Sequence, residues 1–270
     1  MKLKEINEFS HYQRIVDSYK RKGYLTNDYL YNEVRELISQ ERLYECCGVN
    51  NAFLFVKKEE CQRLYYYLND LTEKHDFDLD ENLVVEILFR GNIGTPDDEI
   101  EYLKKNGFDS FLRRDQYSAM YKDLAVSEEV EEVVVEVAKS IDLVEWACLF
   151  FNATFDHYTG DYISCEEYQT ILDDGNMLIA SSPSGEKLGA LHQTINKGVA
   201  TLSHVAVIPE ARGNHVGQAL LNAFIELNHV DERSRYMLWV QAQNVPAVRM
   251  YQKKGFKYVG KSTISMLKLK

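Results

Sequence analysis

The feature that most constrains the fold of this chain is a degenerate internal repeat. The segment TNDYL at 26–30 returns as TGDYI at 159–163, 133 residues later, and each copy leads into an acidic stretch of helical character. A second echo relates YLKKNGF at 102–108 to MYQKKGF at 250–256, 148 residues later. Because such self-similarity marks structural units that are built alike, the sequence predicts two copies of one fold. The unequal spacings indicate that the first copy lacks a segment.

Length and composition agree with two folded units. A chain of 270 residues exceeds the usual size of a single core, and 45% hydrophobic with 27% charged residues is ordinary for globular proteins. We place the domain boundary near Ala125, where charge rises and the strand pattern restarts. The predicted domains are therefore residues 1–125 and residues 126–270.

Hydrophobic periodicity predicts similar elements in both copies. In the second copy it predicts strands at 133–138, 177–181, 188–195, 200–208, 236–241 and 258–268, and helices at 141–155, 166–172, 216–227 and 246–254. In the first copy it predicts strands at 2–6, 53–56, 63–68 and 83–89, and a helix at 10–22. Only 14 residues separate Leu68 from Leu83, whereas the matching connection in the second copy has 28. The first copy therefore lacks a glycine-bearing loop and its long helix.

Charge and cysteine usage exclude several classes of protein. The 31 basic and 42 acidic residues give a net charge of −11, which disfavours nucleic-acid binding. No apolar run is long enough to span a membrane, and the first residues are too polar for a signal peptide, so we expect a cytoplasmic protein. The five cysteines lack metal-type spacing. We therefore expect reduced thiols and no metal site.

The stretch that carries chemistry runs from Val205 to Leu221 (VAVIPEARGNHVGQALL). A buried strand enters a loop that contains Arg212, Gly213 and Gly217, and the loop opens directly into a helix. Free backbone N–H groups and the positive end of the helix dipole suit a pyrophosphate. An ordinary glycine-containing turn before a helix is the alternative at this point.

A second motif favours a pyrophosphate-binding loop over an ordinary turn. Residues 244–256 fit the pattern N-x-x-A-x-x-x-Y-x-x-x-G-F, at the expected distance after an R-x-x-G-x-G loop. With these two motifs, the second copy resembles the GNAT-type N-acetyltransferase superfamily. The first copy resembles a GNAT fold that lacks the pyrophosphate loop. The resemblance implies an α/β (α+β) protein of two tandem GNAT-like domains, each a mixed, mostly antiparallel sheet flanked by helices. It also implies acetyl-CoA as donor and a primary or peptide amine as acceptor.

The resemblance also assigns roles to individual residues. Those expected to bind acetyl-CoA are Val205, Ala206, Val207, Arg212, Gly213, Asn214, His215, Val216, Gly217, Gln218 and Asn244. For Asn244, a helix N-cap is the alternative. His215 stands where the family pattern has a glycine, and a side chain there crowds the phosphates if φ is positive, although histidine tolerates the left-handed region better than branched residues do.

Two residues are expected to move protons. Tyr251 matches the general acid of the family, which protonates the departing thiolate. His204 is the candidate base because its unperturbed pKa suits proton transfer near neutral pH. A chain of water molecules without a dedicated base is the alternative, and His157, His192 and Glu167 are further candidates to line the acceptor cleft.

The leading hypothesis is an acyl-CoA-dependent N-acyltransferase that transfers acetyl to a primary amine by direct attack. The main rival is a catalytically silent acyl-CoA-binding or interaction module, suggested by His215 and by the missing acidic base. A transfer that depends on aminoacyl-tRNA is disfavoured by the acidic chain.

Overall fold

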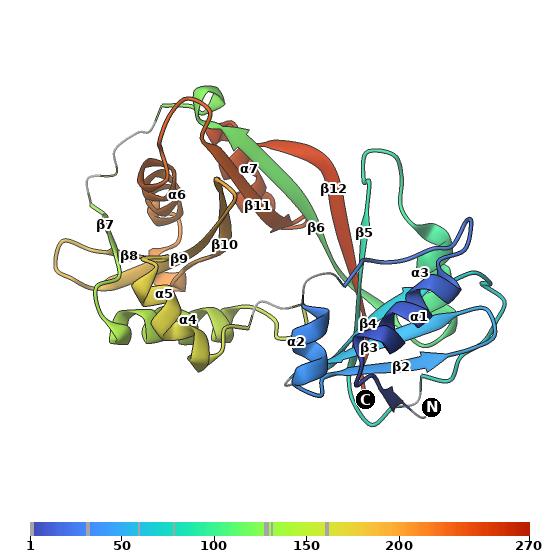
Figure 1. Ribbon diagram of the computed structural model, residues 1–270. Helices are drawn as coiled ribbons and strands as arrows, with labels where there is room; N and C mark the ends of the chain where they lie inside the picture. Colours follow the sequence, from blue (N-terminus) through green and yellow to red (C-terminus); the bar gives the residue numbers. More distant parts are fainter. Residues whose placement is uncertain are drawn as a thin grey trace. The chain divides into compact units, whose positions relative to one another are not determined.

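A computed structural model of the chain describes residues 3–30, 33–58, 60–77, 79–126, 130, 132–159 and 162–270. The described residues form two compact units (Figure 1). Unit 1 extends to Arg114 and includes Gly260–Lys270, and unit 2 is Asp115–Val259. Residues 160 and 161 of the repeat, and 127–129 beside the predicted boundary, lie outside the described residues.

This division differs from the boundary predicted near Ala125. Residues 115–125 group with the second unit, and Gly260–Lys270 group with the first. The reason is that β6 (Asp109–Met120) and β12 (Lys257–Lys268) are long strands that each contribute residues to both units. The division therefore falls within strands, where hydrophobic patterning gives no signal.

Unit 1 is built on a mixed sheet with the strand order β1-β2-β3-β4-β5-β12. Its other elements are β1 (Lys4–Glu5), β2 (Leu43–Cys47), β3 (Ala52–Lys57), β4 (Gln62–Tyr67), β5 (Leu83–Phe89), α1 (Phe9–Tyr19), α2 (Val34–Ser39) and α3 (Asp97–Lys105). Neighbouring strands are antiparallel except β4 and β5, which are parallel. Residues Ser262–Lys268 of β12 pair with β5, so the end of the chain completes this sheet.

Both faces of the unit 1 sheet are buried. Alternate residues of β3 point to opposite faces, with Leu54 in a cluster with residues of α1 and α2, and Phe55 in a cluster with residues of α3. Every residue of β3 from Ala52 to Val56 is consequently buried. Burial on both faces explains the continuous apolar run AFLFV in the sequence.

A short segment fills the space where β4 and β5 of unit 1 separate. These strands pair only over Gln62–Leu64 and Leu83–Val85. Beyond that point the Asn27 side chain donates from Nδ2 to the carbonyl oxygens of Leu64 and Glu86, each at 3.0 Å, and accepts from the N–H of Tyr66 at 2.9 Å. Asn27 is 3% exposed, so its carboxamide closes the gap between the diverging strands.

Unit 2 is built in the same way, with the strand order β6-β11-β10-β9-β8-β7. Its strands are β7 (Val134–Val137), β8 (Met177–Ser181), β9 (Lys187–Asn196), β10 (Val199–Val207) and β11 (Arg235–Gln241). Its helices are α4 (Ile141–Thr154), α5 (Tyr168–Asp173), α6 (Val216–Leu227) and α7 (Val245–Lys254), with short 3₁₀ turns η1 (Tyr121–Asp123), η2 (Cys165–Glu167) and η3 (Pro209–Ala211). Only β10 and β11 are parallel among the pairs from β7 to β11, which confirms the predicted mixed, mostly antiparallel α/β fold.

The two faces of the unit 2 sheet carry different helices. Met177 and Ile179 of β8 belong to a core cluster with α4 and α5, whereas Leu178 and Ala180 belong to a cluster with α6 and α7. Figure 1 shows α4 and α5 together on one side of β8 and β9, with α6 on the other. This alternation fixes the face of Met177–Ala180 of β8, whereas in β10 it is reversed by the register shift between Leu202 and His204.

Candidate functional site

The site begins where β10 parts from β11. These strands pair over Val199–Leu202 and Arg235–Leu238, and the register of β10 against β9 then shifts between Leu202 and His204. In the described part of the chain, no further pairs join β10 and β11, although β10 continues to Val207. The edge of β10 beyond Leu202 therefore presents main-chain donors and acceptors to an extended ligand.

The loop after β10 leads into the N-terminus of α6. Gly213 has a φ of +88°, and His215 lies in the left-handed region with a φ of +59°. Such a backbone costs a residue other than glycine about 1 kcal/mol. The ring of His215 contacts Gln218 in the first turn, with 3.3 Å between Nδ1 and Oε1. The opening N–H groups of α6 have no acceptor within the helix, so they are available to an anion.

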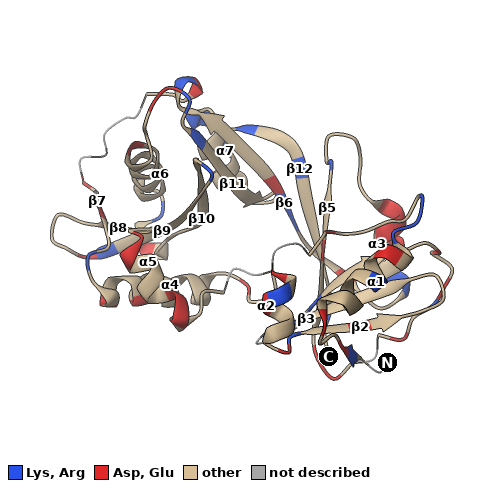
Figure 2. Cartoon of the chain, viewed as in Figure 1, with Lys and Arg blue, Asp and Glu red and all other residues tan. Residues whose placement is uncertain are grey.

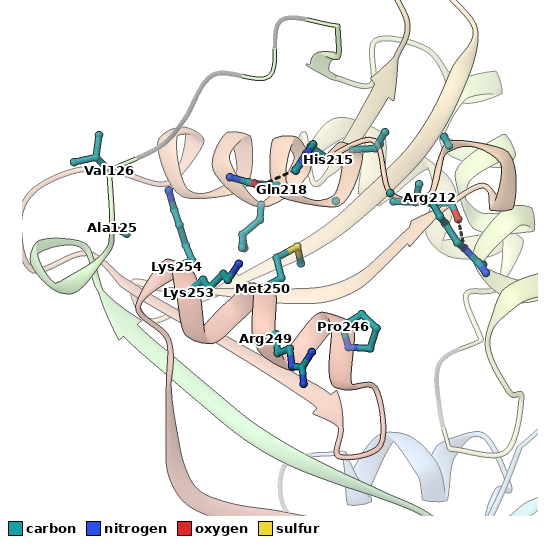
Figure 3. Close-up of a pocket in the computed structure, with 16 residues that line it drawn as sticks. Ala125, Val126, Arg212, His215, Gln218, Pro246, Arg249, Met250, Lys253 and Lys254 are labelled. Atoms are coloured by element: carbon teal, nitrogen blue, oxygen red, sulfur yellow. Dashed lines mark hydrogen bonds between the residues drawn. The ribbon is translucent and has the colours of Figure 1, made fainter.

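A pocket of about 840 Å³ lies between this loop and α7 (Figure 3). Its sixteen lining residues are Ala125, Val126, Val207, Ala211, Arg212, Gly213, His215, Val216, Gly217, Gln218, Leu221, Pro246, Arg249, Met250, Lys253 and Lys254. Four of these described lining residues are Lys or Arg, and none is Asp or Glu. The volume is typical of a cofactor-sized ligand, and the charge selects an anionic one.

Three of the cationic residues come from α7. Arg249 and Lys253 are four residues apart and therefore share a helix face, with Lys254 beside them. Burial lowers the pKa of Lys254, and the opposing effect of Glu226 is weaker. Figure 2 shows acidic residues on α3, α4 and α5, whereas the described lining of this pocket contains no acidic residue. Sequence patterns do not identify these residues as part of a site, because Lys and Arg on one helix face usually indicate a solvated surface.

The predicted acetyl-CoA residues separate into two groups. Those that line the pocket are Val207, Arg212, Gly213, His215, Val216, Gly217 and Gln218. Those outside its lining are Val205, Ala206, Asn214 and Asn244. Asn214 lines a neighbouring cavity of about 450 Å³, and the Asn244 Oδ1 caps α7 by accepting from the N–H of Ala247 at 3.2 Å. Asn244 is thus the helix N-cap that its sequence context allowed.

Tyr251 lies in the core beneath the pocket rather than in its lining. Its side chain is 3% exposed and its ring meets Phe256 edge-on, with centroids 6.0 Å apart. Burial raises the pKa of Tyr251 well above its usual value. The phenol is therefore protonated at neutral pH and can only donate to a sulfur atom that reaches it. Its role as general acid stays a prediction.

His204 lies just past the register shift, on the sheet face covered by α4. It pairs across the strands with His192 of β9, and the Nδ1 atoms of the two rings are 3.2 Å apart. The ring of Phe151 lies 5.4 Å from that of His204, between centroids. His157, by contrast, contacts the carbonyl oxygen of Asn152 at 2.8 Å through Nε2. The structure therefore brings His204 together with His192 at the point where β10 and β11 diverge.

Two further observations bear on the type of protein. Among the described residues, no helix combines the length and apolar character needed to cross a bilayer. In the same residues, no three His, Cys, Asp or Glu side chains are grouped so as to hold a metal ion.

Comparison with known proteins gives a family match for part of the chain and the fold for most of it. Residues 140–256 match the model of the Acetyltransferase (GNAT) family. No curated protein matches the chain in sequence. A GCN5-related N-acetyltransferase from Sphaerobacter thermophilus is similar with a TM-score of 0.62 at 11% identity, over 92% of this chain and 96% of that one.

Two other solved structures share the fold over most of their length. A GNAT-family acetyltransferase from Colwellia psychrerythraea has a TM-score of 0.55 at 13% identity and covers 100% of both chains. A tandem GNAT protein from the clavulanic acid biosynthesis pathway has a TM-score of 0.51 at 11% identity, over 83% of this chain and 81% of that one. Residues 140–256 therefore resemble the GNAT acetyltransferase family, and the solved structures show the same fold over most of the chain.

Proposed function

We propose that the protein is an acyl-CoA-dependent N-acyltransferase that moves acetyl from acetyl-CoA to a primary amine by direct attack. The observation that carries this proposal is the cationic pocket at the N-terminus of α6, beside the unpaired edge of β10. A pyrophosphate suits the first N–H groups of α6, and Arg249 and Lys253 suit the remaining phosphate charge. The pantetheine arm suits the β10 edge, because an extended amide chain pairs there like a strand.

The two proton-transferring residues belong to opposite faces of the unit 2 sheet. His204 lies on the face covered by α4, and Tyr251 lies in the core cluster on the face covered by α6 and α7. The thioester carbonyl would lie near the point of divergence, within reach of the main chain of Val205 and Ala206. The amine nitrogen attacks this carbonyl carbon and passes its proton to His204, the carbon–sulfur bond breaks, and the thiolate accepts a proton from Tyr251. His204 then releases its proton to solvent and Tyr251 regains one, so both groups return to their starting state. Each proton transfer of this kind contributes about 10²- to 10⁴-fold in rate.

One donor site per chain is expected. In unit 1 the corresponding gap between β4 and β5 is filled by Asn27, and residues 68–77 and 79–82, which connect these strands, contain no helix. Among its described residues, the connection between β4 and β5 therefore offers neither an open strand edge nor a helix N-terminus to a nucleotide. We propose that it shapes or stabilises the protein rather than binding acetyl-CoA.

Calorimetric titration with acetyl-CoA tests the donor site. A Cβ added at Gly217 would lie 3.6 Å from the Met250 Sδ and 3.8 Å from the Val207 Cγ2, so Gly217→Ala fits the fold and Gly217→Leu fills the pocket. We expect one site per chain, weaker binding in Gly217→Ala and no measurable binding in Gly217→Leu. Gly94→Leu is the control, because a Cβ there meets no atom within 4 Å. Two equivalent sites, or unchanged binding in Gly217→Leu, would refute the assignment.

A silent acyl-CoA-binding module is the second candidate, favoured by the burial of Tyr251 outside the pocket lining. Release of free thiol from acetyl-CoA, measured against a panel of primary amines, separates the two. An enzyme releases thiol in proportion to an acylated amine, whereas a binding module retains intact acetyl-CoA.

A further inference from the structure

The backbone position of His215 is one that glycine occupies most easily. His215 directly precedes α6 with a φ of +59° and a ψ of +10°, in the left-handed region. Its side chain makes no capping hydrogen bond to the helix, so the ring does not satisfy the opening N–H groups of α6. A side chain held in such a sparsely populated conformation points to a functional role. The ring also belongs to the lining of the cationic pocket (Figure 3), so its chemistry bears on the ligand.

One nitrogen of the His215 ring is engaged by its own helix. Nδ1 lies 3.3 Å from Oε1 of Gln218, in the first turn of α6. Because a carboxamide oxygen only accepts, Nδ1 carries the hydrogen, and a neutral imidazole has no second one. Among the described residues, Nε2 has no hydrogen-bond partner. The neutral ring therefore offers a phosphate oxygen only the lone pair of Nε2, whereas a protonated ring offers an N–H.

The charged groups around His215 make the charge of its ring depend on the ligand. In the described lining of the pocket there is no Asp or Glu, and the cationic members are Arg212 from the same loop and Arg249, Lys253 and Lys254 from α7. Acidic side chains line the neighbouring cavity instead, together with Asn214; they are Glu132, Glu186 and Glu210. The four cations repel a positive ring, whereas a bound phosphate attracts it.

We propose that His215 binds the pyrophosphate of acetyl-CoA as an imidazolium, and that it takes up this proton when the donor binds. The inference deepens the proposed function, on which it rests for the identity of the donor. A histidine side chain ordinarily changes charge at about pH 6.5, so a nearby phosphate can shift it from neutral to charged at physiological pH.

The proton balance of this binding step is simple. One proton moves from solvent to Nε2, which then donates to a phosphate oxygen in a charge-assisted hydrogen bond, while Nδ1 keeps its contact with Gln218. No covalent bond of the donor changes, and the proton returns to solvent when CoA leaves. The donor site thereby gains a pH dependence that a glycine at residue 215 could not give.

Calorimetric titration of the full chain measures this proton directly, because the observed binding enthalpy varies with the ionisation enthalpy of the buffer in proportion to the protons taken up. The probes are acetyl-CoA and its 3′-dephospho form, which retains the pyrophosphate but lacks the phosphate monoester that itself titrates at about pH 6. With the dephospho form we expect an uptake of about 0.5 to 0.7 proton at pH 7. Binding should be about 6- to 20-fold weaker at pH 8 than at pH 6, since the charged ring is lost as pH rises.

Variants assign the proton to a residue. His215→Gly and His215→Asn both suit a positive φ, and both should bind the probe with no proton uptake and little change between pH 6 and pH 8. Gln218→Leu removes the acceptor of the Nδ1 hydrogen, so a neutral ring can donate from Nε2, and the uptake should fall. His229→Asn is the matched control, because His229 is an exposed histidine outside the pocket lining, stacked on Tyr121. It should retain the full uptake.

The outcomes separate this inference from the proposed function. Binding without proton uptake in the wild-type protein, or uptake that is unchanged in His215→Asn or Gln218→Leu, overturns the inference and leaves the donor site in place. Uptake with acetyl-CoA that disappears with the dephospho form overturns the assignment to the pyrophosphate. If the wild-type protein binds neither probe at any pH, the proposed donor site fails, and the inference fails with it.

Discussion

Replacement of Asn27 tests whether a side chain has taken the place of a ligand in unit 1. Its carboxamide makes three hydrogen bonds to main-chain groups of β4 and β5, at 2.9 to 3.0 Å. Asn27→Ala leaves the carbonyl oxygens of Leu64 and Glu86 and the N–H of Tyr66 without these partners. Each buried group left unsatisfied costs about 1 to 3 kcal/mol, and a water molecule that enters the space recovers part of it. We therefore expect a loss of about 3 to 5 kcal/mol in the stability of unit 1.

Hydrogen exchange measured by mass spectrometry is the suitable assay, because two units need not unfold in a single transition. Peptides from β4 and β5 should lose protection in Asn27→Ala, and peptides from β8 and β9 should not. Asn27→Asp is the matched variant, since it keeps the shape but presents a carboxylate to two carbonyl oxygens. Folding should raise the pKa of that carboxyl, so the stability of Asn27→Asp should increase as pH falls. A loss below about 1 kcal/mol in Asn27→Ala would show that the side chain does not hold the strands.

Two further predictions concern unit 2 and the division of the chain. Tyr251→Phe should lower turnover and leave the affinity for acetyl-CoA nearly unchanged, because only the hydroxyl is lost. Steady-state kinetics measure the turnover and calorimetry measures the affinity. Unchanged turnover with a good acceptor would exclude Tyr251 from catalysis. A fragment of residues 126–270 should aggregate, since it lacks the β6 residues of unit 2 and retains a β12 segment whose partner strand β5 is absent, whereas 115–259 should be monomeric and bind acetyl-CoA. Gel filtration compares the two fragments, and a monomeric, active 126–270 would contradict the observed division.

Much of the fold could be predicted because its strands are apolar and bounded by turns. The predicted strands 83–89 and 177–181 coincide with β5 and β8. The strand β6 was missed, since its sequence DSFLRRDQYSAM has no apolar alternation. The pairing of β12 with β5 was also missed, because a strand's sequence does not specify its distant partner.

The candidate site was predictable only where a motif constrains the backbone. The loop from Arg212 to Gln218 follows such a pattern, and most of its residues line the pocket. The cross-strand contact of His192 with His204 depends on a register shift between Leu202 and His204 that the sequence does not mark. Asn27 was seen as part of a repeat, but the gap it fills exists only once β4 and β5 have diverged.

The pairing of β5 with the end of β12 has a consequence for how the protein is made. Ser262, the first β12 residue paired with β5, is synthesised roughly 170 residues after Phe89, the last residue of β5. At about 5 to 20 residues per second, the apolar edge of β5 leaves the ribosome about 10 to 35 s before its partner. An unpaired apolar strand edge recruits other chains, so this interval exposes the nascent protein to misassembly. Although most of unit 1 precedes unit 2 in the sequence, its sheet is therefore completed only after all of unit 2 has been made.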